Sequence, residues 1–132
     1  LLDLPRHFLD NFKKFQSMPN VRLSIGYILQ HSSVYTLQNV IEFANANDIK
    51  IWMSEVYDDS GYLGINSVVS EDVDRAKSQL DYCTDEQKKT VQCWLDSYYF
   101  DAKLHQKYTE YVKTLDSIRG TDFVKTFNPS WT

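Results

Sequence analysis

Few residues in this chain of 132 combine a reactive side chain with a telling position. His31 is one, because it directly follows Val21–Gln30, a segment rich in Ile, Leu and Tyr and typical of a buried strand. If that strand is parallel to its neighbour, His31 lies at the carboxyl end, where α/β proteins bind ligands. A lone imidazole has no partner nearby in the sequence, so the simpler interpretation is a polar turn residue.

The cysteines and one acidic pair are the other candidates for chemistry. Cys83 and Cys93 are ten residues apart, about 15 Å on one helix and too far to share a metal ion, so buried structural thiols are favoured. Asp58 and Asp59 resemble a metal-binding pair, but they begin a segment of turn residues that accounts for them equally well. The sequence contains no P-loop, GxGxxG, GxSxG or HExxH motif. We therefore expect no catalytic residue and no metal site in this chain.

The elements that would position these residues form one unit. Val21–Gln30 and Ile49–Tyr57 have strand character, and apolar residues recur between them at helical spacing: Leu37, Val40, Ile41 and Ala44. Strand, amphipathic helix and strand indicate a βαβ unit with two parallel strands and a right-handed crossover. An amphipathic helix, Pro5–Ser17, precedes the first strand. The predicted fold class is α/β.

The second half of the chain has the pattern of helices. Thr84–Gln87 is a capping box that begins one of them, and Gly120 is a helix stop. The periodicity leaves open whether 84–119 is one helix or two. We predict a single domain, with an αβαβ unit over 1–66 and C-terminal helices over 67–132.

Strand alternation divides the strand residues between two faces. One face of the first strand carries small or polar residues and suits a cavity: Ser24, Gly26 and Ile28. The other face suits helix packing: Leu23, Ile25 and Tyr27. On the second strand Trp52, Ser54 and Val56 share a face, and the pattern does not decide whether this face or that of Ile51 and Met53 points inward.

Composition excludes several classes of function. The net charge is −4, with acidic and basic residues interspersed, so nucleic acid is not an expected partner. No apolar run is long enough to cross a bilayer, and the first residues lack the basic segment of a signal peptide. We expect a cytoplasmic protein that does not bind membranes.

Five segments, in this order, resemble the C-terminal part of twitch-domain-containing radical SAM proteins: Pro19–Gln30, Val34–Leu37, Ile49–Glu55, Tyr62–Asn66 and Thr114–Phe127. The likeness spans nearly the whole chain. It is most marked in the tail, with its Leu-Asp and Arg-Gly pairs and a closing Phe-Asn-Pro. The resemblance implies that the two strands end a partial (βα)6 barrel, and that this chain is a C-terminal fragment or subunit of the enzyme, lacking the N-terminal half of the barrel.

The resemblance also implies roles for individual residues. Four residues would wall the cavity for S-adenosylmethionine: Ser24, Gly26, Ile28 and Ser54. Three would lie at its rim: Gln30, His31 and Tyr57. The CxxxCxxC motif of the catalytic 4Fe–4S cluster is absent, so cluster and S-adenosylmethionine are expected only in the full-length enzyme, acting on a peptide or protein. This chain alone would not be catalytically competent.

The alternative hypothesis is a small α/β protein–protein interaction module without catalysis. We expect the isolated chain to form a homo-oligomer, because a two-stranded parallel sheet leaves an edge and a face without partners. The contact would be made by the edge at Val21–Tyr27 or by the cavity face. The alternative is that the C-terminal helices, through Trp94, Tyr98 and Tyr111, cover the exposed face and keep the chain monomeric.

Overall fold

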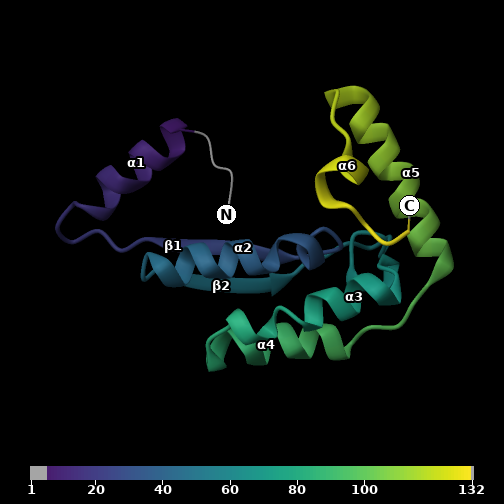
Figure 1. Ribbon diagram of the computed structural model, residues 1–132, viewed down its shortest axis with the longest axis horizontal. Coiled ribbons are helices and arrows are strands. Elements are labelled where there is room, and N and C mark those ends of the chain that lie inside the picture. Colours follow the sequence, from purple (N-terminus) through teal and green to yellow (C-terminus); the bar gives the residue numbers. More distant parts are fainter. Residues whose placement is uncertain (1–5, 132) are drawn as a thin grey trace.

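The computed structural model describes residues 6–131, and its first half is the predicted βαβ unit preceded by a helix (Figure 1). The order is α1 (Arg6–Gln16), β1 (Ser24–Leu29), α2 (Ser33–Ala46) and β2 (Lys50–Glu55). The strands pair in parallel, in a register that runs from Ser24 opposite Lys50 to Leu29 opposite Glu55. The predicted parallel pairing is confirmed, although both strands are shorter than predicted. Pro5 of the predicted first helix lies outside the described residues.

A serine hydroxyl fixes the point where β1 ends and α2 begins. The Ser33 hydroxyl donates a hydrogen bond to the Ile28 carbonyl (2.8 Å) and accepts one from the Gln30 N–H (3.0 Å). These bonds occupy the polar groups that a longer strand would use in its ladder, so the chain turns into the helix at once.

The second half is helical, with the elements η1 (Ile65–Ser67), α3 (Ser70–Lys77), η2 (Leu80–Tyr82), α4 (Asp85–Asp96), α5 (Ala102–Arg119) and α6 (Phe123–Phe127). Thr84 and Gln87 form the predicted capping box at the start of α4. Residues 84–119 form two helices, α4 and α5, and residues 97–101 are the break between them. Asn66 stabilises this break, because its side-chain oxygen accepts from the Tyr99 N–H and its carbonyl from the Asp101 N–H, both at 2.9 Å.

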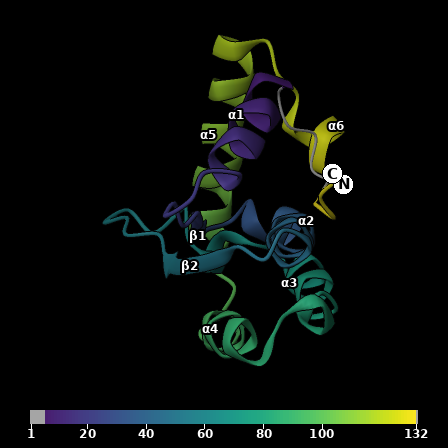
Figure 2. The same cartoon turned by 90° about the vertical axis from the view of Figure 1, so that its left-hand side faces the viewer.

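The core lies on one side of the sheet and draws on both halves of the chain. In Figure 2, α2 and α3 lie on the same side of the two strands, with α4 beyond β2. Fully or almost fully buried side chains fill the space between them: Leu29, Val34, Leu37, Ile41, Val68, Val73, Val91, Trp94 and Leu95. The other face of the sheet remains open, and α5 rises away from it at the carboxyl end of the strands (Figure 1).

Candidate functional site

The open face of the sheet carries the residues that the sequence assigned to a cavity. Three of them are exposed to solvent: Ser24, Gly26 and Ser54. The exposed fraction of Ile28 is 46%. A Cβ built on Gly26 meets no heavy atom within 4 Å. This face is therefore free for a ligand, another polypeptide segment or a second copy of the chain.

The structure also decides the orientation of β2. Trp52 points to the open face and is 60% exposed, whereas Ile51 and Met53 pack against the core. The Lys50 ammonium lies 4.1 Å from the centre of the Trp52 ring. This cation–π contact is solvent-exposed and weak, so it does not hide the indole.

A second feature of the sheet is an apolar groove of about 420 Å³ beside the free edge of β1. One wall is the phenylalanine face of α1, with Phe8 and Phe15 about half exposed, and the other includes Leu23 and Ile25. Phe43 of α2 also lines the groove, and its ring contacts that of Phe12 with a centroid distance of 5.4 Å, which packs α1 against α2. The groove thus lies at the amino end of β1, a strand whose outer edge has no partner among the described residues.

The three residues assigned to the rim have different environments. Gln30 lines a cavity at the carboxyl end of β1, and Tyr57 is 92% exposed. His31 lies in the turn after β1, as the simpler interpretation expected, but it is completely buried and so not open to solvent in this chain. Its ring stacks on Tyr108 of α5, with 3.5 Å between the ring centroids and an interplanar angle of 9°.

The His31 imidazole belongs to a buried hydrogen-bond network. Its Nδ1 lies 2.7 Å from the Ser67 hydroxyl, which donates its own proton to the Gly64 carbonyl. Nδ1 must then be the donor, so the neutral ring carries its proton there. Nε2 faces the Tyr35 hydroxyl at 3.5 Å. Burial, and secondarily the charge of His105, lower the pKa of His31 to about 3, so the ring stays neutral at physiological pH.

The network ends at a buried carboxylate. Tyr35 donates to Asp72 Oδ2 at 2.7 Å, and Asp72 also accepts from the N–H and the hydroxyl of Ser130. Burial and the neighbouring carboxylate raise the pKa of Tyr35, so its hydroxyl remains a donor. Asp72 is therefore stabilised by charge-assisted hydrogen bonds, since no cation forms an ion pair with it among the described side chains.

Serine, histidine and a carboxylate are the components of a hydrolytic triad, but this arrangement cannot act as one. Ser67 and His31 are both completely buried, and Tyr35 stands between the imidazole and Asp72. No substrate can reach the Ser67 hydroxyl, whose proton is also directed away from the imidazole. The network instead joins the end of β1, η1, α3 and the C-terminal residues.

The remaining candidates for chemistry are the two cysteines and the Asp58–Asp59 pair. Cys83 is partly buried, and burial raises the pKa of its thiol. Cys93 is exposed, so the prediction of a buried thiol is wrong there, because this residue lies on the solvent side of α4. Asp58 makes a turn, accepting from the N–H and hydroxyl of Ser60 and from the Leu63 N–H. Residues 6–131 contain no cluster of three or more His, Cys, Asp or Glu side chains that could hold a metal ion.

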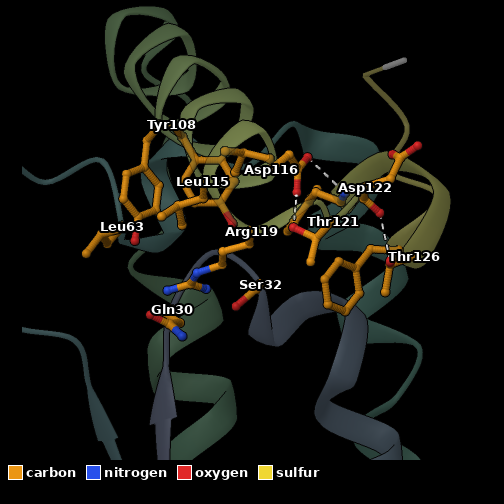
Figure 3. Close-up of a pocket in the computed structure, with 14 residues that line it drawn as sticks. Gln30, Ser32, Leu63, Tyr108, Leu115, Asp116, Arg119, Thr121, Asp122 and Thr126 are labelled. Carbon is orange, nitrogen blue, oxygen red and sulfur yellow. Dashed lines mark hydrogen bonds between the residues drawn. The ribbon is translucent and has the colours of Figure 1, made fainter.

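A cavity of about 390 Å³ lies where α5 and α6 meet the end of β1 (Figure 3). Residues of α5 and α6 provide most of its lining, and Gln30, Ser32 and Leu63 complete it. Sequence reasoning missed this site, because Tyr108, Tyr111 and Leu115 have the spacing of a packing stripe. The arginine that ends the same stripe, Arg119, was a usable signal.

No family model, curated protein or solved structure matches this chain. None of the helices in residues 6–131 has the length and apolar character needed to cross a membrane.

Proposed function

We propose that this chain forms the closing end of a larger (βα) barrel in a radical SAM enzyme and provides one wall of its cavity. The observation that carries the proposal is a parallel sheet covered on one face only. Parallel strands are normally covered on both faces. Here the uncovered face carries Ser24, Gly26 and Ser54, and such small residues let a ligand approach the backbone closely.

The groove beside β1 supports the same proposal. Helix α2 leads from β1 into β2, and α1 precedes β1 as α2 precedes β2. A strand preceding α1 would pair with the free edge of β1 and fill the groove between Phe8 and Leu23. The added strand and α1 would then form a βα unit like that of β1 and α2, and consecutive units of this kind build a (βα) barrel.

The residues of this chain fit a cavity wall better than a set of cluster ligands. A 4Fe–4S cluster needs several thiolates at one centre, so the rest of the enzyme would hold it. Cluster and S-adenosylmethionine would supply the radical chemistry, on a peptide or protein substrate. Ser24, Gly26, Ile28 and Ser54 would shape the space beside them, with Gln30 and Tyr57 near its edge.

The first test is the coding sequence upstream of Leu1. The proposal expects a CxxxCxxC motif in the same frame roughly one hundred residues or more earlier, since each βα unit takes about thirty. In that whole polypeptide, Gly26→Leu should lower S-adenosylmethionine cleavage at least tenfold, whereas the exposed control Ser117→Leu should not. The isolated chain should tolerate Gly26→Leu, because the space above Gly26 is open. Absence of the motif, or full activity of Gly26→Leu, would refute the proposal.

The exposure of Trp52 and Ile28 favours a second candidate function, an interaction module that pairs with a second copy of itself. Closing two such faces on each other would have to bury on the order of 1,000 Å² in total for a stable dimer. Sedimentation equilibrium at micromolar concentration should then give a dimer that Trp52→Asp converts to a monomer. A monomeric wild-type chain would rule this candidate out.

A further inference from the structure

The cavity between α5, α6 and the end of β1 has the size and lining of a small-molecule site. Its volume of about 390 Å³ falls within the range of such pockets. The walls are mainly aromatic and aliphatic: Leu63, Tyr108, Tyr111, Val112, Leu115, Phe123 and Phe127. Aromatic walls of this kind favour a planar ring, which can pack edge-on or offset against them.

The two carboxylates in the lining are already used by the protein. Asp116 accepts from the Thr121 hydroxyl at 2.7 Å and from the Phe123 N–H at 3.0 Å, and these bonds lower its pKa. Asp122 caps α6 by accepting from the Lys125 N–H at 3.0 Å. Both side chains therefore hold the turn between α5 and α6.

Arg119 is the one cationic side chain in the lining of this cavity, and it is exposed to solvent. It is the last residue of α5 and makes no hydrogen bond or ion pair with any described residue. In Figure 3 its guanidinium extends from the helix across the cavity towards Gln30 and Ser32. A guanidinium in this position presents a donor fork suited to a carboxylate.

Tyr108 provides a second unused donor. Its side chain is only 4% exposed, but its hydroxyl makes no hydrogen bond to the described residues and is not a buried atom, so the oxygen is open to the cavity that the residue lines. Burial raises the pKa of Tyr108, so the hydroxyl keeps its proton at neutral pH and can donate it to a ligand.

We propose that this cavity binds a small aromatic carboxylate, with the carboxylate on Arg119, the ring among the aromatic walls and a polar substituent on the Tyr108 hydroxyl. The inference does not depend on the barrel, since every residue in it belongs to this chain. It can therefore fail or succeed separately from the proposed function.

The test is a titration of the ¹⁵N-labelled chain with 3-(4-hydroxyphenyl)propionate, followed by amide chemical shifts. We expect shifts around α5 and α6, and at least tenfold weaker binding of the neutral amide of the same compound. Arg119→Gln should weaken binding of the carboxylate about tenfold, and Tyr108→Phe several-fold. Lys113→Gln is the matched control, because it removes an exposed cation of α5 that does not line the cavity.

Three results would overturn the proposal. One is the absence of shifts at millimolar ligand, and another is equal binding of carboxylate and amide. The third is full affinity in Arg119→Gln. Spectra of the free variants show whether each is folded, and if Tyr108→Phe unfolds, the amide comparison on the wild-type chain still decides the question.

Discussion

Replacing His31 should remove a large part of the acid sensitivity of this fold. The imidazole is completely buried and neutral, with its pKa lowered to about 3 by burial and by the charge of His105. In the unfolded chain the same side chain titrates near the ordinary value of about 6.5. Below that pH the unfolded state binds a proton that the folded state does not, so stability is present above about pH 6.5 and is lost as the pH falls towards 3.

The size of the effect follows from the two pKa values. Between them, the free energy of unfolding falls by about 1.4 kcal/mol per pH unit for this one group. Between pH 7 and pH 5 the loss attributable to His31 is therefore about 2 kcal/mol. Other groups add to the total, so the informative quantity is the difference between the wild-type chain and a variant without this imidazole.

The variant is His31→Asn, whose amide can still donate to the Ser67 hydroxyl in place of Nδ1. Urea unfolding at pH 7 and pH 5, followed by tryptophan fluorescence, should show a smaller loss of stability for His31→Asn than for the wild type, by about 2 kcal/mol. His7→Asn removes an exposed imidazole on α1 and serves as the control. Equal pH dependence in His31→Asn and wild type would refute the reasoning, as would an NMR titration of wild-type His31 with a midpoint near pH 6.5.

Three further predictions concern the capping box, the core and the cysteines. Thr84→Ala should destabilise the fold by about 1 kcal/mol in urea unfolding, because it removes the α4 cap, and an unchanged midpoint would contradict this. Leu37→Ala should lower the free energy of unfolding by about 2–5 kcal/mol, because Leu37 is fully buried. The control Ile118→Ala, at a position that is 75% exposed, should lower it by less than about 0.5 kcal/mol. Equal losses in the two variants would show that Leu37 is not a core residue. Anaerobic reconstitution with iron and sulfide should leave the chain colourless, and a stoichiometric cluster lost in Cys83→Ala and Cys93→Ala would show otherwise.

The parallel unit could be predicted because each of its elements carries a strong local signal. The strand segments are rich in Ile, Val, Tyr and Trp, and the helix between them has an unbroken apolar spacing. A strand–helix–strand order then fixes a parallel pairing with little dependence on distant residues. The alternation of side chains along a strand predicted that Ser24 and Gly26 share one face, and in the structure both residues lie on the open face of the sheet.

The buried network could not be predicted, since it depends on contacts between residues far apart in the sequence. His31 meets Ser67 across 36 positions, and Asp72 meets Ser130 across 58. No local pattern marks a histidine for burial when its partners come from other elements. The break near residue 100 was left open for the same reason, because it is held by Asn66 from η1.

The cavity between α5 and α6 shows a related limit of periodicity. A stripe of Tyr108, Tyr111 and Leu115 has the same spacing whether it packs in a core or lines a hollow. Only the tertiary position of α6, fixed by Asp116 and Asp122 at the turn, decides between the two. The position of Arg119 in the lining of the cavity depends on that placement as well.

The bond between Asp72 and Ser130 has a consequence for synthesis of the protein. Asp72 Oδ1 receives its side-chain and backbone donors from Ser130, so the carboxylate on α3 stays incompletely satisfied until that residue has left the ribosome. A nascent chain can form the sheet and α2 early, but α3 cannot settle against Tyr35 without leaving part of a charge buried and unpaired. A polypeptide truncated before Ser130 would therefore have a core that reopens easily, and cellular proteases could distinguish it from one that contains Ser130.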